Sequence, residues 1–248
     1  MKRRIGAVLL VTAAALSVGT FVAVSGGASD APGRSVEAKK PIRFEQHDLF
    51  IEFNATDGDA GLQLNLDGEN WKRFRLRDPK GRVLVDLGAH GRLSRPPNGL
   101  SELFFEASEP PFTEVPFGKF KRLFPEGTYR FTGVAGDGRR IVGSDHLSHL
   151  IPKAPRVTFP TKGAQVDPSN LKVSWEPVTS PAGVRIVSYQ VIVSQGKREL
   201  SMYLPPSATS AGIPREFLEA GTRTGGEVLA RERSGNQTIS EIPPFKTK

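Results

Sequence analysis

The stretch from residue 171 to residue 193 reads LKVSWEPVTSPAGVRIVSYQVIV and contains two runs of alternating apolar and polar side chains. In the first run Val173 and Trp175 are flanked by polar residues, and in the second the odd-numbered residues 187–193 form the more apolar set. Alternation with a period of two is typical of a β-strand with one buried face. Residues 177–183, between the runs, hold two prolines and a glycine, which favour a turn. The stretch therefore predicts two consecutive β-strands joined by a turn.

These two strands, with Trp175 near the end of the first and Tyr189 inside the second, resemble strands B and C of a fibronectin type III domain. The resemblance covers nearly all of residues 156–246. Residues 215–222 (REFLEAGT) also match the family's approach to strand F, where a leucine fills the core beneath a turn. The family usually has a tyrosine just after the Gly-Thr step, whereas this chain has Thr224. We expect this loss to destabilise the domain by about 1–3 kcal/mol without changing its fold.

Residues 42–150 show the same alternation in several segments, with a pattern of helical spacing in one place. Strands are predicted at 49–55, 62–66, 72–87 (a hairpin), 101–107 and 140–149, with a short helix at 114–124. Turn signals lie at Asp57-Gly58-Asp59 and at Asp67-Gly68. The sequence EGTYRF, which contains Tyr129, resembles the tyrosine corner of immunoglobulin-like sandwiches. We therefore predict an all-β protein with two tandem β-sandwich domains, an N-terminal immunoglobulin-like one with a short inserted helix and a C-terminal fibronectin type III-like one.

The start of the chain has the pattern of a secretory signal peptide, which we place at residues 1–31. Lys2, Arg3 and Arg4 precede an uncharged apolar run, and small residues suited to cleavage follow it. The alternative is a retained helix that anchors the chain in a membrane, which is the only membrane contact we expect. A flexible leader is predicted at 32–41.

The predicted domains are joined by a linker at 151–155 (IPKAP), whose two prolines restrict bending. Two sandwiches joined in this way are expected to form a rod. The predicted signal peptide would place both of them outside the cytoplasm, so we predict a secreted or periplasmic protein. The processed chain resembles small secreted bacterial proteins that carry a fibronectin type III domain.

The composition excludes several kinds of site. The chain has no cysteine, which excludes disulfides, thiolate nucleophiles and a lipidated lipobox. The formal charge of +8 includes three positive charges in the predicted signal peptide. A modest positive charge affects solubility and non-specific association. No nucleic-acid motif is present, so we expect no nucleic-acid partner.

The acidic turn near residue 57 is the one candidate metal site. The predicted ligands are Glu52, Asn54, Asp57 and Asp59. Calcium takes roughly six to eight oxygen ligands from carboxylates, amides and carbonyls. Three further carboxylates could complete the ligand set if their strand lies close to the turn: Glu102, Glu106 and Glu109. A structural calcium ion is one hypothesis, and an ordinary Asp-Gly turn with no cofactor is the other.

No catalytic residue is predicted. The chain lacks a G-x-S-x-G elbow, and Ser144, Asp145 and His146 are neighbours on a predicted strand, where side chains alternate between faces. Glutamate pairs in the N-terminal domain leave open a carbohydrate-active hydrolase. Six phenylalanines between residues 104 and 124 are interpreted as core, with an exposed aromatic platform as the alternative.

The sequence thus favours an exported, non-enzymatic binding or adaptor protein that recognises a protein or glycan through β-sandwich surfaces. The alternatives are the hydrolase and a structural envelope protein anchored by an uncleaved N-terminal helix.

Overall fold

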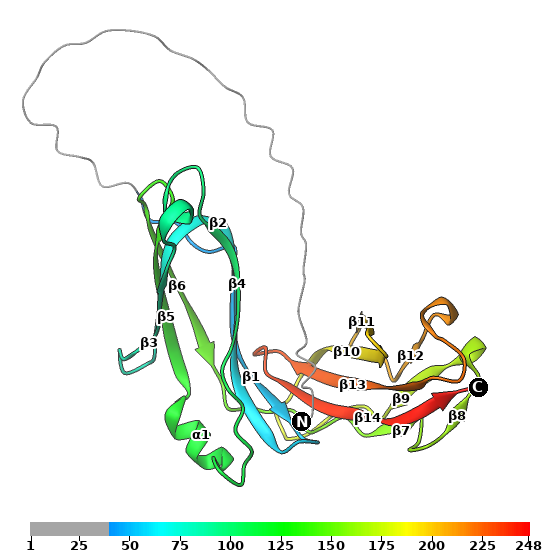
Figure 1. Cartoon of the computed structure of the whole chain (residues 1–248). Helices are drawn as coiled ribbons and strands as arrows, with labels where there is room; N and C mark the ends of the chain where they lie inside the picture. Colours follow the sequence, from blue (N-terminus) through cyan, green and yellow to red (C-terminus); the bar gives the residue numbers. More distant parts are fainter. Residues whose placement is uncertain (1–39) are drawn as a thin grey trace, which may run out of the picture.

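The computed structural model describes residues 40–248. The predicted signal peptide and all but the last two residues of the predicted leader lie outside the described residues. Figure 1 shows two β-rich modules that meet at a steep angle. Within the described part of the chain, no helix is both long and apolar enough to span a bilayer.

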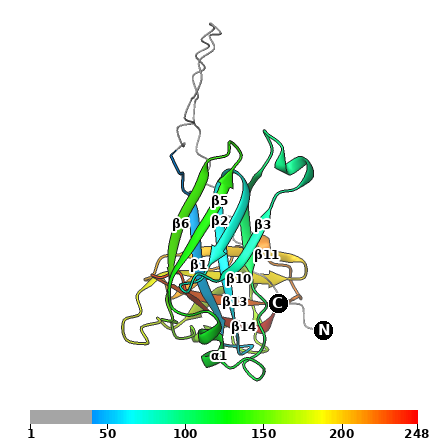
Figure 2. The ribbon, with the colours of Figure 1, turned by 90° about the vertical axis from the view of Figure 1, so that its left-hand side faces the viewer.

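The N-terminal module contains six strands and two short helices. They are β1 (Gln46–Asn54), β2 (Asp59–Arg77), β3 (Val83–Gly88), η1 (Gly91–Ser94), β4 (Leu100–Glu106), α1 (Phe117–Leu123), β5 (Gly127–Ala135) and β6 (Arg140–Leu147). The first half of β2 pairs with β1 and β4, and its second half pairs with β3 and β5. One 19-residue strand therefore belongs to both layers of the sandwich. Figure 2 shows β6, β5, β2 and β3 side by side in the second layer.

The turn predicted at Asp67-Gly68 is wrong, because β2 continues through both residues. A Cβ atom at Gly68 would lie 3.1 Å from a ring carbon of Phe44. Glycine at this position lets Phe44 pack closely against the strand where it passes from one layer to the other. The residue is needed for close approach rather than for a turn.

The core of this module is built from the inward-facing side chains of β1, β2, β5 and β6. Phe120 of α1 is also buried in it, and four more of the six phenylalanines are half-buried against it: Phe105, Phe112, Phe117 and Phe124. The core interpretation is wrong for Phe104, which lies on the outer face of β4. The Tyr129 hydroxyl donates a hydrogen bond to the Pro125 carbonyl at 3.0 Å. This contact confirms the predicted tyrosine corner.

The C-terminal module contains eight strands and two short helices. They are β7 (Val157–Phe159), β8 (Gln165–Val166), η2 (Pro168–Asn170), β9 (Lys172–Trp175), β10 (Ile186–Gln195), β11 (Arg198–Leu204), β12 (Ser210–Gly212), η3 (Arg215–Phe217), β13 (Arg223–Glu232) and β14 (Gln237–Thr247). One sheet has the order β12-β9-β7, and the other contains β11-β10-β13-β14 with β8 added to β14. Trp175 and Tyr189 pack in the core between them, with ring centroids 5.3 Å apart.

A polar network stands where the family's tyrosine is missing. The Thr224 hydroxyl accepts a hydrogen bond from Gln195 Nε2 at 2.8 Å, and both side chains are buried. The Gln195 amide also accepts from the Glu219 backbone N–H at 2.6 Å. The corner is therefore held by Gln195 from the neighbouring strand β10, which offsets part of the destabilisation expected from the sequence.

The two modules share a continuous sheet at their junction. β1 pairs in parallel with the start of β14, with Glu52 opposite Gln237 and Asn54 opposite Ile239. Figure 1 shows β1 and β14 meeting where the modules join. We call this pairing the β1–β14 joint. The predicted rod is wrong, because this joint brings the two modules together at an angle. Pro152 of the linker is also buried there.

Three consecutive side chains of the C-terminal module tie the joint together. Asn236 is fully buried, and its amide oxygen accepts from the Ile51 N–H at 2.8 Å. Its amide nitrogen donates to the carbonyls of Ser148 and Leu150 at 2.8 and 3.1 Å. Gln237 donates to the Glu52 carboxylate, and the Thr238 hydroxyl donates to the Pro152 carbonyl at 2.6 Å. The strand start thus binds both the N-terminal module and the linker.

We expect Asn236→Ala to lower the free energy of unfolding by about 2–4 kcal/mol, because it leaves a buried N–H and two carbonyls without their partner. Urea denaturation followed by tryptophan fluorescence measures this, since each module contains one tryptophan. The matched control is Asn98→Ala, whose exposed amide makes a single 3.3 Å contact and should cost under ~0.5 kcal/mol. Equal effects of the two substitutions would contradict the assignment of the joint.

Candidate functional site

The structure gathers the predicted calcium ligands in a cleft of about 420 Å³ at the β1–β14 joint. We call it the acidic cleft. The acidic and amide side chains that line it from the N-terminal module are Glu52, Asn54, Asp57, Asp59, Glu106 and Glu109. They come from the end of β1, the β1–β2 turn, the start of β2, the end of β4 and the loop after it.

The β1–β2 turn forms as predicted, and Asn54 holds it. The Asn54 side-chain oxygen accepts from the backbone N–H groups of Thr56 and Asp57, both at 3.0 Å. Such Asx turns are a common way for a short polar side chain to fix a loop. Gly58 takes a left-handed conformation with φ of +71°. The turn therefore orients Asp57 toward the cleft, and the Asn54 oxygen is already used within the turn.

Three glutamates converge beside this turn. Glu52, Glu106 and Glu109 each offer a carboxylate oxygen, and these atoms lie within 4.8 Å of one another. Gly61, which faces Glu52 across the strands, makes the convergence possible. A Cβ atom there would lie 2.4 Å from Glu109 Oε1. The missing side chain of Gly61 thus provides the space that the Glu109 carboxylate occupies.

The C-terminal module closes the cleft with Glu227 and Ile239. Burial raises the pKa of Glu52 to about 7, against the opposing effect of the Gln237 hydrogen bond, and the nearby charge of Glu106 adds to the rise. Burial likewise raises the pKa of Glu227 to about 8, and the charge of Glu52 adds to it. Carboxylates from both modules therefore repel one another in a poorly solvated space.

The sequence identified part of this site. It named Glu52, Asn54, Asp57 and Asp59, all of which line the cleft, and of the three further candidates Glu106 and Glu109 line it while Glu102 does not. It missed Glu227 and Gln237. These residues lie on β13 and β14, at least 170 positions after Asp57, and no local sequence pattern links such distant strands to the acidic turn.

This arrangement has two chemical uses. Carboxylate oxygens are hard ligands that suit calcium, and an ion here would offset the repulsion between the modules. Alternatively, a carboxyl group with a raised pKa beside a second carboxylate has the composition of a glycosidase acid pair.

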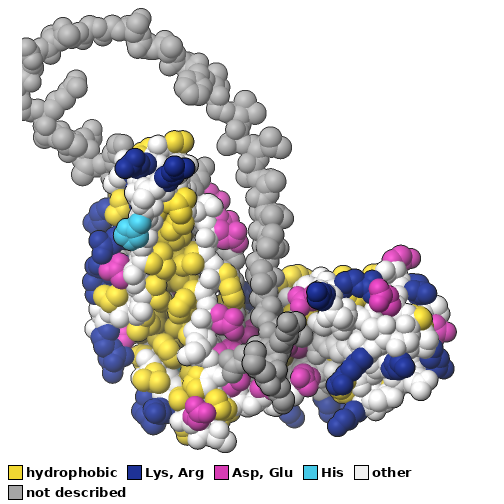
Figure 3. Space-filling model, in the orientation of Figure 1, with side chains coloured by type: hydrophobic (Ala, Val, Ile, Leu, Met, Phe, Trp, Pro, Cys, Tyr) yellow, Lys and Arg dark blue, Asp and Glu magenta, His cyan; other side chains and the backbone are white. Residues whose placement is uncertain are grey.

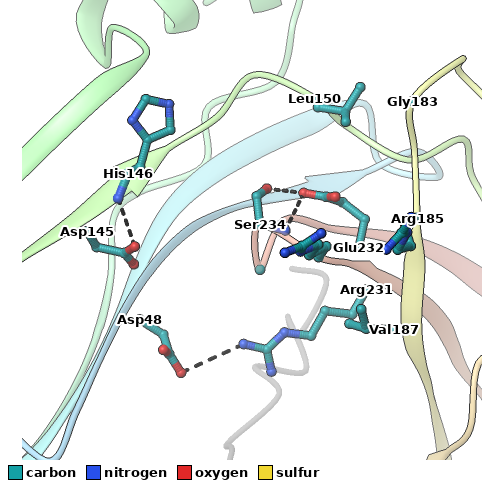
Figure 4. A pocket seen from close by; sticks show the side chains of 12 residues that line it. Asp48, Asp145, His146, Leu150, Gly183, Arg185, Val187, Arg231, Glu232 and Ser234 are labelled. Carbon is teal, nitrogen blue, oxygen red and sulfur yellow. Dashed lines mark hydrogen bonds and ion pairs between the residues drawn. The ribbon is translucent and has the colours of Figure 1, made fainter.

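A second depression, of about 730 Å³, lies on another side of the joint (Figure 4). The Arg231 guanidinium lies 3.9 Å from the Asp48 carboxylate of β1 and 5.4 Å from the centre of the Phe50 ring. The Glu232 carboxylate accepts from the Ser234 backbone N–H at 2.8 Å and caps the β13–β14 turn. The Arg231–Asp48 contact therefore crosses the joint, whereas Glu232 acts within the C-terminal module.

The Ser144-Asp145-His146 sequence does not form a catalytic triad. The Asp145 carboxylate accepts from the backbone N–H groups of Leu49 and His146, at 2.8 and 2.7 Å. Figure 4 shows the His146 ring directed away from that carboxylate. Asp145 therefore connects β6 to β1 instead of orienting an imidazole.

No protein-family model and no curated protein matches the chain. Solved structures do match. The fibronectin(III)-like modules of Clostridium thermocellum CbhA are 11% identical, with 85% of this chain and 92% of that chain covered at a TM-score of 0.35. The FN1–FN3 domains of chicken CNTN1 are 11% identical, with 85% of this chain and 69% of that chain covered at a TM-score of 0.34. A two-domain fibronectin type III segment of chicken tenascin is 13% identical, with 82% of this chain and 99% of that chain covered at a TM-score of 0.30.

The strand order of the C-terminal module is the more direct evidence. Its sheets β12-β9-β7 and β11-β10-β13-β14 correspond to strands E-B-A and C′-C-F-G. The C-terminal module is fibronectin type III-like. This confirms the fold predicted from the Trp175 and Tyr189 strands.

We expect calcium to raise the melting temperature of the wild-type protein by several degrees at 100 times its dissociation constant, by mass action. Glu106→Gln should abolish most of this rise, because it removes one of the three converging carboxylates. Glu114→Gln, at an exposed glutamate outside the cleft, is the control. Differential scanning calorimetry measures the three proteins, and an unchanged wild-type melting temperature would contradict the calcium hypothesis.

Without metal, the raised pKa of Glu52 makes stability depend on pH. The folded state holds a proton that the unfolded state releases above pH 4.5, so stability falls as pH rises from about 4.5 through 7. Glu52→Gln keeps an acceptor for Gln237 but cannot titrate. We therefore expect its free energy of unfolding to fall by about 1–3 kcal/mol less than that of the wild type between pH 5 and pH 8. Urea denaturation in a chelating buffer measures both proteins, and parallel pH profiles would refute the assignment.

Proposed function

We propose that the chain is an exported, non-enzymatic binding or adaptor protein that recognises a protein or a glycan through the surfaces of its two β-sandwiches. Fibronectin type III-like folds commonly act as binding or adaptor modules. Function depends on particular sites rather than on the fold, so the proposal needs an observation from this chain.

The β1–β14 joint is that observation. It makes the neighbouring sheets of the two modules continuous and buries Asn236 completely. The linker contributes as well, since Pro152 is buried and the Lys153 N–H donates to the Ser180 carbonyl at 2.8 Å. Surfaces held in one orientation lose less entropy on binding than surfaces on freely moving domains. A fixed two-module unit therefore suits recognition of an extended partner.

Export and calcium are parts of the same proposal. Export to the periplasm or the medium is inferred from residues 1–31, with cleavage close to Ala28. A calcium ion in the acidic cleft would be structural, holding carboxylates of both modules together.

The alternative function is a carbohydrate-active hydrolase. The observation in its favour is the raised pKa of Glu52 beside Glu106. Against it, Glu52 is only 7% exposed and already binds Gln237, which limits access of a sugar to its carboxylate. The third alternative, an envelope protein with an uncleaved anchor, concerns residues outside the described part.

Expression of the full chain in a bacterial host tests the proposal. We expect an exported product that begins near Ser29, which its intact mass would show. We also expect saturable binding to a glycan on an array, or cross-linking to a specific protein among the secreted proteins of the host. We also expect no release of nitrophenol from a panel of nitrophenyl glycosides. Turnover that disappears in Glu52→Gln would overturn the proposal in favour of the hydrolase, and a product retained in the cytoplasm would overturn export.

A further inference from the structure

The N-terminal sandwich is open along one side. Within the described residues, β3 and β4 each pair only with β2, so each has a free edge on this side. The side chains between them belong to the core but are only partly buried, among them Val85, Leu87, Leu103 and Phe105. Figure 3 shows the resulting apolar band along the module. We call this opening the β3–β4 seam.

The two faces of β4 differ in chemistry. Leu103 and Phe105 face the core opposite Leu66 and Leu64, two fully buried residues of β2. The intervening residues, Glu102, Phe104 and Glu106, lie on the opposite face of the strand. Both glutamates are exposed. β4 is therefore apolar toward the seam and acidic on its outer side.

The neighbouring strands extend this acidic side. In register with β4, the outward positions of β2 hold Gln63, Asn65 and Asp67. Those of β1 opposite them hold Phe50, Asp48 and Gln46, and Phe50 is buried beneath Arg231 of the C-terminal module. Within β1, β4 and residues 59–67 of β2, none of the outward positions is lysine or arginine, whereas the second half of β2 carries outward arginines. Figure 3 shows acidic side chains beside the apolar band. We call this surface the acidic face.

The free edge of β4 has backbone groups to offer. The Ala107 N–H donates to the Leu62 carbonyl at 2.9 Å, so odd-numbered residues at this end of the ladder direct their N–H groups toward β2. In an antiparallel ladder the alternate residues point the other way. The N–H and C=O groups of residues 102, 104 and 106 are thus directed away from β2, to the open side.

The corresponding edge of β3 is electrostatically different. Asp86 on β3 is paired with both Arg73 and Arg75, which contact its carboxylate from β2. The hydrogen bonds that both guanidinium groups donate to the Asp86 carboxylate lower its pKa. The acid on β3 is already neutralised, whereas Glu102 and Glu106 have no ion pair within the described residues. The β4 edge therefore has the stronger preference for a cationic partner.

We propose that the free edge of β4 binds an extended polypeptide strand in which basic and apolar residues alternate. The proposal rests on the proposed binding function and names the partner class. Backbone groups of the partner pair with β4, its apolar side chains enter the β3–β4 seam, and its basic side chains meet Glu102 and Glu106 on the acidic face. An arginine between these two basic residues lies opposite Phe104 and stacks on its ring.

Fluorescence polarisation with the mature chain tests the proposal in a chelating buffer, which keeps calcium from occupying Glu106, with the labelled peptide acetyl-GKVRVKG-amide as the probe. We expect saturable binding that is at least tenfold tighter than binding of acetyl-GKRKVVG-amide, which has the same composition without alternation. Backbone amide shifts in a heteronuclear NMR titration should be concentrated in residues 100–106. Phe104→Pro, which removes one outward N–H, should weaken binding at least tenfold.

A charge exchange keeps the test sharp if the proline variant fails to fold. Glu102→Lys/Glu106→Lys should lose the basic peptide and bind acetyl-GEVEVEG-amide instead. Glu114→Lys/Glu216→Lys makes the same change in net charge at exposed sites outside β4 and should keep the original preference.

Equal binding of the two basic peptides, shifts outside β4, or no exchange of preference would overturn the proposal. If the peptides fail while the exported chain still captures a protein or glycan, the β4 assignment is wrong and the proposed function stands.

Discussion

The parallel pairing of β1 with β14 is the contact on which the rest of the structure depends. It places Asn236 where its amide satisfies a backbone N–H and two carbonyls of the N-terminal module. Each of these groups would be costly to bury without a partner. The same pairing covers the start of the β14 edge, which would otherwise be free to pair with another chain. The angle between the modules, the acidic cleft and the groove around Arg231 all follow from this joint.

The joint brings a cost in electrostatic repulsion. Glu52 and Glu227 come from different modules, and burial together with mutual repulsion raises the pKa of both. A proton held in the cleft relieves the repulsion and stabilises the joint, and a cation bound there would act in the same direction. The stability of the module interface therefore depends on the pH and the cation concentration of the surrounding solution. Both differ between the cytoplasm and the compartments to which the chain is predicted to be exported.

The N-terminal sandwich separates its charges between its two layers. Arginines of the second half of β2 pair with Asp86 on one layer, while the other layer has acidic and amide side chains on its outer face. The long strand β2 makes this possible, because its two halves lie in different layers and carry different outward residues. The open seam between β3 and β4 lies where these layers part, with a charged rim on the β4 side.

The sequence alone determined the local structure: period-two alternation predicted β1, β4, β10 and the β2–β3 hairpin, and Trp175 with Tyr189 predicted the fibronectin type III-like module. It also predicted the acidic turn and named Glu52 to Asp59, since those residues are close along the chain. Only the tertiary structure decided that Gly68 lies inside a strand, that Asn236 is buried in a joint between the modules, and that Glu227 completes the cleft. These outcomes depend on packing between residues more than 20 and up to 185 positions apart, and alternation records which face of a strand is buried but not which strand lies beside it.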